Sequence, residues 1–197
     1  MADTVIDFIR HGEPEGGRRF RGYGVDDPLS EKGWAQMWAA VPDAPPWTQI
    51  ISSPLLRCRQ FAEALAARCD IAVTLDDRLK EVGFGEWEGK APALIQQLDA
   101  EAYAAFYRDP LQNRPAGAEP WDQFVARVSA ALDEVNKNFS GQQVLVVTHA
   151  GVIRAVAAKV LDASARAAYR IGVDNASISR FRYDGNHYRL EYLNRTR

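Results

Sequence analysis

The sequence predicts an α/β fold, a three-layer αβα sandwich around a mostly parallel sheet with an antiparallel C-terminal edge. Near-continuous apolar runs at residues 5–9 and 144–147, and a shorter one at residues 50–51, each lead into a helical pattern. That rhythm is typical of parallel strands covered on both faces. Residues 177–193 alternate on both sides of Asp184-Gly185, a dipeptide that favours a tight hairpin turn. We therefore expect the last two strands to be antiparallel and near an edge.

Helical patterns lie between these strands. Serines near the starts of residues 30–40 and 53–68 predict two capped helices. Residues 91–108 form a third helical pattern rich in alanine, and residues 109–120 then break it with three prolines and a glycine. We expect this excursion to lie over the edge of the active site. A long helix over residues 121–138 carries one apolar stripe and should pack on the sheet.

The length and net charge of the chain limit the kinds of molecule that it is expected to bind. The 197 residues, 47% of them hydrophobic, predict a single domain over residues 1–197 with one core. The formal net charge of -2 and the pI near 5.9 argue against nucleic acid or a polybasic membrane surface, because both need a large cationic field. The sequence therefore favours a small-molecule partner.

Targeting signals and cysteine usage indicate a compartment. No apolar run approaches the roughly 20 residues that span a bilayer, and the start MADT lacks the basic and apolar regions of a secretory signal. Cys58 and Cys69 form no C-x-x-C pair and are too few for a disulfide framework. Their helical spacing with Ala62 and Leu65 indicates core packing. We expect a soluble, cytoplasmic protein in a reducing compartment.

Cationic and imidazole side chains follow three of the predicted strands. Arg10 and His11 follow the first, Arg57 lies in the first turn after the second, and His149 follows the strand at residues 144–147. In open α/β sheets ligands bind beyond the carboxyl ends of the strands, and helix N-termini there favour anions. A lone histidine or arginine is more often structural than functional. Packing alone does not explain four such side chains at three strand ends, so the sequence predicts a phosphate site.

The arginine beside His11 has a chemical consequence. The cation of a histidine flanked by arginines is disfavoured, so the imidazole stays neutral at working pH. A neutral imidazole nitrogen is a nucleophile. Arg10 and Arg57 can grip the oxygens of a phosphate dianion, and His149 can donate a further hydrogen bond to it. The sequence therefore favours attack on phosphorus by His11.

The chain resembles the histidine phosphatase superfamily, which has the phosphoglycerate mutase-like fold. Five blocks in the family's order carry this resemblance, and together they are far more specific than RHG alone. The blocks are RHGE at residues 10–13, DDPLSEKG at 26–33, SSPLLRCRQFAEAL at 52–65, LKEVGFGEWEG at 79–89 and VVTHAGVIR at 146–154.

The resemblance implies a role for each matched residue. His11 would become a phosphohistidine, Arg10, Arg57 and His149 would form the phosphate pocket, and Glu81 would protonate the leaving group and later activate water. No metal or other cofactor is implied. A zinc site built on the two histidines is disfavoured, because Arg10 would repel the ion and no H-x-x-x-H or C-x-x-C spacing is present.

The loop after the RHGE block departs from the commoner family pattern. Arg21 and Gly22 are predicted to bind substrate, because they lie where the family often places residues facing the phosphate. Glu13, the last residue of the RHGE block, is also predicted to bind substrate. Arg18 and Arg19 are expected to face solvent.

Two acidic residues near Glu81 are open to a structural interpretation. We expect Glu88 to be a solvated loop charge, and we leave a role for Glu86 open.

Within the superfamily the chain looks most like the α-ribazole phosphatases, which remove a 5'-phosphate from a cobalamin precursor. The resemblance therefore implies hydrolysis of a small phosphorylated metabolite. Two alternatives remain: a phosphoglycerate mutase-type transfer, and a phosphate-binding module without catalysis. His187 lies just after the hairpin turn and is expected at the surface, and the C-terminal strand pair could form a homodimer contact.

Overall fold

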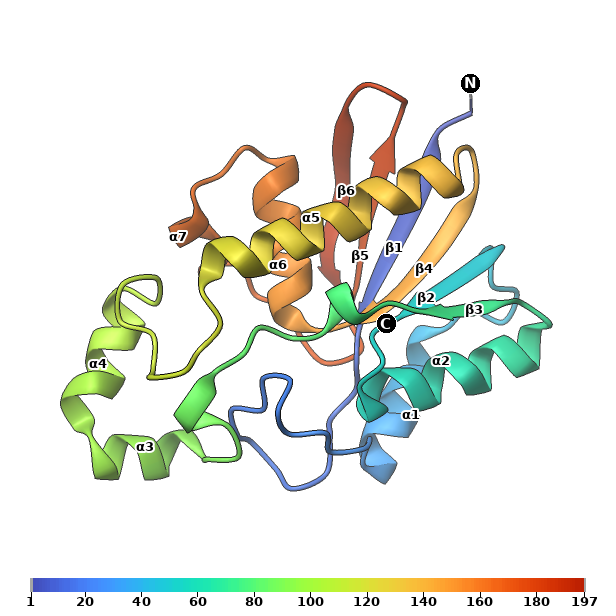
Figure 1. Ribbon diagram of the computed structural model, residues 1–197. Coiled ribbons are helices and arrows are strands. Elements are labelled where there is room, and N and C mark those ends of the chain that lie inside the picture. The colour runs from blue at the N-terminus through green and yellow to red at the C-terminus, as the bar shows by residue number, and fades with distance from the viewer. Residues whose placement is uncertain (1, 197) are drawn as a thin grey trace.

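The computed structural model describes residues 2–196 and contains a six-stranded sheet of order β3-β2-β4-β1-β5-β6 (Figure 1). β1, β2, β3 and β4 pair in parallel, whereas β5 runs antiparallel to both β1 and β6. The predicted α/β class, with its mostly parallel sheet and antiparallel C-terminal edge, is confirmed. The strands are β1 (Thr4–Arg10), β2 (Gln49–Ser52), β3 (Val73–Leu75), β4 (Gln143–Thr148), β5 (Ile178–Tyr183) and β6 (Tyr188–Arg195).

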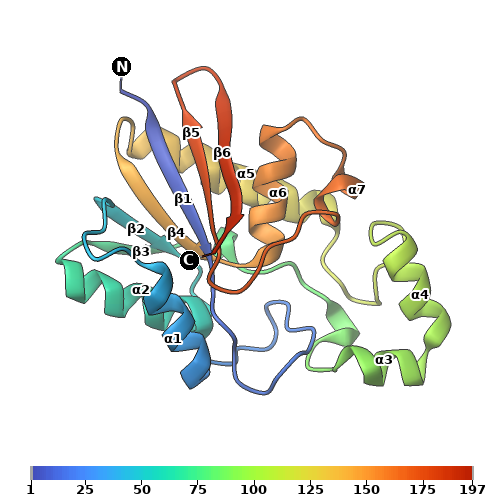
Figure 2. The same cartoon turned by 180° about the vertical axis from the view of Figure 1, so that it is seen from behind.

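Four helices cover the two faces of the sheet, so that α5 passes in front of the strands in Figure 1 and behind them in Figure 2. These helices are α1 (Glu31–Ala40), α2 (Leu56–Cys69), α5 (Trp121–Asn138) and α6 (Ala150–Val160). Successive side chains of β1 alternate between the two faces. Ile6 and Phe8 pack in the core of α5 and α6, and Ile9 packs in the core of α1 and α2. The predicted three layers follow from this alternation.

Only one of the two predicted serine caps forms. Ser30 caps α1, since its Oγ accepts a hydrogen bond from the backbone N–H of Gly33 at 3.0 Å. The second prediction was wrong, because α2 begins at Leu56 and its N-cap is Leu55. Ser53 instead lies directly after β2, and its hydroxyl is 2.8 Å from Nε2 of His149. The Ser53 side chain therefore contacts His149 and does not cap α2.

The predicted helix over residues 91–108 is interrupted. It consists of α3 (Pro92–Leu98) and α4 (Ala100–Arg108), separated at Asp99. The Asp99 carboxylate accepts a hydrogen bond from the N–H of Ala102 at 2.8 Å and so caps α4, because a short acidic side chain competes for backbone donors. Both helices lie away from the sheet around a small separate core that includes Trp87, Ile95 and Phe106 (Figure 1).

The remaining short elements connect the layers. They are the 3₁₀ turns η1 (Asp77–Leu79) and η2 (Gly85–Trp87) and the helix α7 (Ala165–Ala168). The three-residue edge strand β3 is too short to show a period of its own in the sequence. None of the helices within residues 2–196 combines the length and the apolar character that a membrane span requires.

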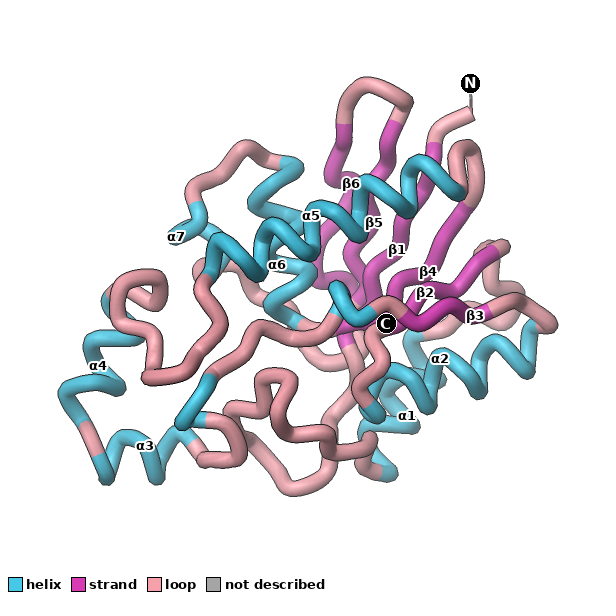
Figure 3. The backbone as a smooth tube through the Cα atoms, viewed as in Figure 1, coloured by secondary structure: helices cyan, strands magenta, loops and turns pink. Residues whose placement is uncertain are grey.

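Loops gather at one end of the sheet, below β1, β2 and β4 in the view of Figure 3. The chain leaves all three strands at this end, because they are parallel. It is joined there by the segment that follows β3. The side chains that follow three strands are thereby placed at one edge, as the sequence predicts.

Candidate active site

The two histidines meet because their strands are neighbours. Arg10 is paired with Thr148 in the parallel register of β1 and β4, and the next residues, His11 and His149, therefore leave the sheet side by side. The backbone N–H of His11 donates to the carbonyl of Thr148 at 2.9 Å. The two imidazole rings lie 5.2 Å apart, centre to centre. Strand register thus brings together two side chains far apart in the sequence.

His11 is held in one tautomer and in its neutral form. Its Nδ1 lies 2.7 Å from the carbonyl oxygen of Gly12, which can only accept, so Nδ1 carries the proton. The lone pair therefore lies on Nε2. Burial lowers the pKa of His11 well below its ordinary value, and the charges of Arg57 and Arg10 lower it further. The geometry leaves a neutral nitrogen with a free lone pair.

His149 is fully buried at the N-terminus of α6. Its Nε2 is 2.8 Å from the hydroxyl of Ser53 and 3.6 Å from the thiol of Cys58. Burial lowers the pKa of His149 well below its ordinary value, and Arg57 acts in the same direction. Burial also raises the pKa of the Cys58 thiol, which fits the predicted packing role of this residue. Ser53 orients this imidazole, a contact that the sequence analysis missed.

Two arginines present buried N–H groups to the site. Arg57 is 1% exposed and donates to the carbonyls of Val25 at 3.0 Å and Gly22 at 2.8 Å. Arg10 donates to the carbonyl of Val173 at 2.6 Å. Within residues 2–196 the Nε atoms of both arginines are buried without an acceptor. An unsatisfied buried donor costs about 1–3 kcal/mol, so both groups suit an anionic ligand with acceptor oxygens.

Glu81 is held against the N-terminal turn of α6. Its Oε1 accepts hydrogen bonds from the backbone N–H groups of Gly151 at 3.1 Å and Val82 at 3.0 Å. A Cβ atom at position 151 would lie 2.2 Å from that oxygen, so the close approach requires glycine there. Burial lowers the pKa of Arg10, and the nearby Glu81 carboxylate opposes this effect. The five predicted catalytic residues are therefore brought to one place.

The profile of the histidine phosphatase superfamily (branch 1) matches residues 6–196. This chain belongs to the histidine phosphatase superfamily. The family that the sequence blocks predict is thereby confirmed, whereas the phosphatase activity and the roles of individual residues stay predictions.

Known relatives and structures agree with this membership. The bifunctional protein Rv2228c of Mycobacterium tuberculosis is 33% identical over 180 residues, which cover 89% of this chain and 49% of that protein. The chain spans about half the length of the first curated relatives it matches. YhfR of Bacillus stearothermophilus superposes with a TM-score of 0.90 at 26% identity over 98% of both chains. The α-ribazole phosphatase of Shigella flexneri shares the fold, with a TM-score of 0.84 at 24% identity over 97% of this chain and 96% of that one.

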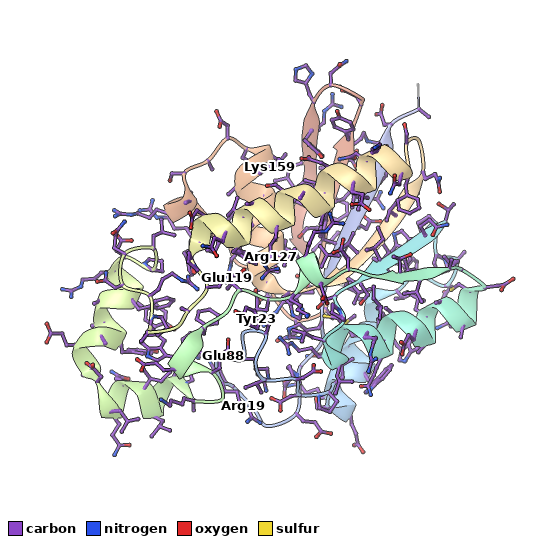
Figure 4. The ribbon with its side chains drawn as sticks, in the orientation of Figure 1. Arg19, Tyr23, Glu88, Glu119, Arg127 and Lys159 are labelled. Carbon is purple, nitrogen blue, oxygen red and sulfur yellow. The ribbon has the colours of Figure 1, made fainter. Side chains whose placement is uncertain are left out.

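The segment that carries Glu81 is held by an ion pair that the sequence does not reveal. Arg127 of α5 and Glu119, both labelled in Figure 4, form a bidentate pair at 2.7 and 2.8 Å. The Arg127 guanidinium also donates to the carbonyls of Lys80 at 2.8 Å and Glu81 at 3.0 Å. The Glu119 carboxylate in turn accepts from the N–H of Gly83 at 3.1 Å. The backbone is therefore fixed on both sides of Glu81.

The expectation that Glu88 is a solvated loop charge was wrong. Its carboxylate accepts hydrogen bonds from the backbone N–H groups of Phe84 at 2.7 Å and Gly24 at 2.8 Å, and so joins two loops (Figure 4). A Cβ atom at Gly22 would lie 1.8 Å from Glu88 Oε1. Glu86, by contrast, is exposed, and its side chain forms no hydrogen bond or salt bridge within residues 2–196. The sequence does not reveal the role of Glu88, because its partners are backbone N–H groups. One belongs to Gly24 in the loop after β1, and the other belongs to Phe84, four residues earlier.

The arginines of the loop after β1 differ in their surroundings. Arg18 is exposed, as expected. The expectation for Arg19 was wrong, because its side chain is 27% exposed and lies 3.3 Å from the Asp27 carboxylate. Arg21 donates to the same carboxylate at 2.8 Å and to the carbonyl of Gly17 at 2.7 Å. These contacts hold the loop together.

Gly22 and Glu13, which are also predicted to bind substrate, contact protein groups in different ways. Gly22 has φ = +54°, a conformation that favours glycine, and its carbonyl accepts from Arg57. The Glu13 carboxylate pairs with Lys32 of α1 at 2.7 Å. Gly22 thus contacts a predicted catalytic arginine, whereas the Glu13 carboxylate is engaged by α1.

Acid is expected to destabilise the protein below about pH 6.5, the ordinary histidine value. The pKa values of His11 and His149 are lowered in the folded state, so the unfolded chain binds more protons below pH 6.5. Stability is therefore fully present above that pH and is lost as pH falls, by about 1.4 kcal/mol per pH unit for each histidine. Urea unfolding between pH 7.5 and 5 would measure this slope.

Matched variants isolate the contribution of the site. His11→Asn should give a shallower dependence of the free energy of unfolding on pH, because one buried imidazole is removed. His187→Asn on the exposed hairpin should keep the wild-type slope. Equal slopes in all three proteins would contradict the neutral, buried state of His11.

Proposed function

We propose that this chain hydrolyses phosphomonoesters without a metal ion, through a phosphohistidine on His11. The observation that carries the proposal is the His11 tautomer: Nδ1 is bound to the Gly12 carbonyl at 2.7 Å, so Nε2 is free to attack. Arg10 precedes His11 in the chain, and Arg57 precedes Cys58, whose thiol is 3.6 Å from His149 Nε2. The Nε atoms of both arginines are buried without an acceptor within residues 2–196. A neutral nucleophile beside donors suited to three phosphate oxygens is the arrangement that phosphoryl transfer needs.

In the first half-reaction Nε2 of His11 attacks phosphorus as the ester P–O bond breaks. Arg10, Arg57 and His149 stabilise the charge on the transferring phosphoryl oxygens. The alcohol oxygen leaves with the electron pair of the broken bond and takes a proton from Glu81, which enters this step as the carboxylic acid, because an alkoxide is a poor leaving group. The products are the alcohol and a phosphohistidine.

In the second half-reaction water attacks phosphorus and the N–P bond breaks. Glu81, now a carboxylate, accepts a proton from the water, and the electron pair of the broken bond returns to His11 Nε2. Inorganic phosphate leaves, and both residues regain their starting states. The Arg127–Glu119 pair supports these steps by fixing the backbone around Glu81.

For the substrate we propose α-ribazole 5'-phosphate or a related small phosphate ester. The support is the likeness of the sequence blocks around Arg57 and Glu81 to the α-ribazole phosphatases. Phosphoryl transfer within a phosphoglycerate, as in a mutase, is the competing outcome.

The test is inorganic phosphate release by the purified protein with a chelator present. The panel contains α-ribazole 5'-phosphate, other nucleoside monophosphates, 3-phosphoglycerate and an aryl phosphate. Release from at least one ester in chelator supports a metal-independent phosphatase, and a preference in kcat/KM for the ribazole ester supports that substrate. Formation of 2-phosphoglycerate without phosphate release would indicate a mutase instead, and no reaction at all would overturn the proposal.

A further inference from the structure

A cavity of about 480 Å³ lies between α4, the α7 region and the loop after β1. Five of its lining side chains are arginines, namely Arg18, Arg108, Arg154, Arg166 and Arg170. Five more lining residues are aromatic, and none of the acidic residues within 2–196 lines the cavity. Positive charges gathered around one cavity raise the local potential and attract an anion that enters.

Most of these arginines have no acidic partner. Arg166 is paired with Asp109, whereas the other four form no salt bridge within residues 2–196. The Arg154 Nε donates to the carbonyl of Ile171 at 2.9 Å, which leaves its terminal nitrogens available. Like charges around one cavity repel one another, and a bound anion would relieve that repulsion.

The cavity adjoins the active site on the side of Glu81. Arg154 follows Gly151 by one turn of α6, and Gly151 holds the Glu81 carboxylate. Phe84, which also lines the cavity, is three residues after Glu81. Burial lowers the pKa of Arg10, and the charge of Arg154 lowers it further. The alcohol that Glu81 protonates would leave toward this cavity.

The aromatic side chains that line the cavity pack against one another. Phe106 of α4 is buried, and its ring lies 6.1 Å from that of Phe20 and 6.0 Å from that of Tyr169. These contacts join the loop after β1, α4 and the residue after α7 into one wall. A surface cluster of solvated arginines would not need such a wall, whereas a site for an anionic group on a carbon skeleton does.

We propose that this cavity binds the alcohol part of the substrate and selects alcohols that carry a second anionic group, a carboxylate or a phosphate. The proposal rests on the proposed phosphatase function. It favours related phosphate esters over α-ribazole 5'-phosphate, whose alcohol part is a nucleoside without a second anion. The ester phosphate would lie at His11, and the second anion would lie among Arg18, Arg154 and Arg170. The carbon skeleton between the two anions would pack on the aromatic wall.

The experiment compares matched pairs of esters that differ in one anionic group. The pairs are 4-carboxyphenyl phosphate with phenyl phosphate, and 3-phosphoglycerate with glycerol 3-phosphate. A third pair, glycerol 1,3-bisphosphate with glycerol 3-phosphate, distinguishes a second phosphate from a carboxylate. We expect kcat/KM to favour the doubly anionic member of at least one pair by about tenfold, equivalent to one charge-assisted contact. Higher salt should reduce the preference.

Variants at exposed positions locate the effect. Arg18→Gln and Arg170→Gln should each reduce the preference severalfold, chiefly through KM for the doubly anionic ester, and leave the rate with phenyl phosphate near the wild-type value. Arg189→Gln, on the exposed start of β6, removes an equal charge outside the cavity and should leave the preference unchanged.

The outcomes separate the cavity from the catalytic proposal. If all esters are hydrolysed with no preference for a second anion, the cavity proposal is overturned and the phosphatase stands. If no ester is hydrolysed, calorimetric binding of the same pairs to His11→Ala repeats the comparison without turnover. A preference there that Arg170→Gln removes supports the cavity, and equal affinities overturn it.

Discussion

Replacing His11 with alanine is expected to abolish the proposed release of phosphate from every ester that the wild-type protein hydrolyses. In the proposed mechanism the imidazole supplies the nitrogen that bonds to phosphorus, and alanine offers no atom for that bond. Because the other groups of the site only assist this step, rates should fall by on the order of 10⁴-fold or more. The measurement is the initial rate of phosphate release at saturating substrate.

A second measurement tests the intermediate. Wild-type protein quenched during turnover should carry one added phosphoryl group that is labile in acid, as a phosphoramidate is, and His11→Ala should carry none. His187→Ala removes an exposed histidine and should retain both the label and the rate. Near-wild-type turnover of His11→Ala, or a label that persists in it, would overturn the assignment of the nucleophile.

The position of this nucleophile is the part of the site that the sequence predicts best. The near-continuous apolar runs of β1 and β4 identify both segments as strands from the sequence alone. Parallel strands place the residues that follow their carboxyl ends at one edge of the sheet. His11 and His149 follow those strands directly, so their proximity needs only the strand order. Arg57 required one further step, because it lies inside the first turn of α2.

The errors have a different physical origin. Asp99 divides a continuous alanine-rich pattern, because its carboxylate binds the backbone of the helix that comes after it. Glu88 looks like a surface charge, because its partner Gly24 lies 64 residues earlier in the chain. Both carboxylates accept hydrogen bonds from backbone N–H groups. Nearly every residue has such a group, so the sequence does not indicate which one is the partner.

The supporting contacts around Glu81 were invisible for the same reason. Arg127 binds carbonyl oxygens 46 and 47 residues earlier in the chain, and any amino acid could supply those oxygens. Its carboxylate partner, Glu119, lies in a loop with several prolines and a glycine. These residues predict an irregular backbone, but they do not predict the path of the loop across the protein. Such contacts depend on how separate segments pack, which periodicity and capping rules do not address.

Replacing Glu81 with glutamine is expected to slow hydrolysis most for esters of poorly acidic alcohols. Glutamine keeps the shape and can still accept hydrogen bonds from Gly151 and Val82, but it has no proton to transfer to the leaving oxygen. General acid catalysis contributes about 10²–10⁴-fold, and an alkyl ester needs that full contribution. A nitrophenyl ester leaves as a stabilised anion and should lose far less.

The measurement is kcat for a series of alkyl and aryl phosphates plotted against the pKa of the departing alcohol. Glu81→Gln should steepen this dependence if the first half-reaction limits the rate, because charge that was neutralised by proton transfer now accumulates on the oxygen. Glu86→Gln, at an exposed position in the same segment, should retain the wild-type slope. An equal loss on all leaving groups in Glu81→Gln would assign the proton to another group, and would leave Glu81 with the activation of water in the second half-reaction, where every substrate shares one phosphoenzyme.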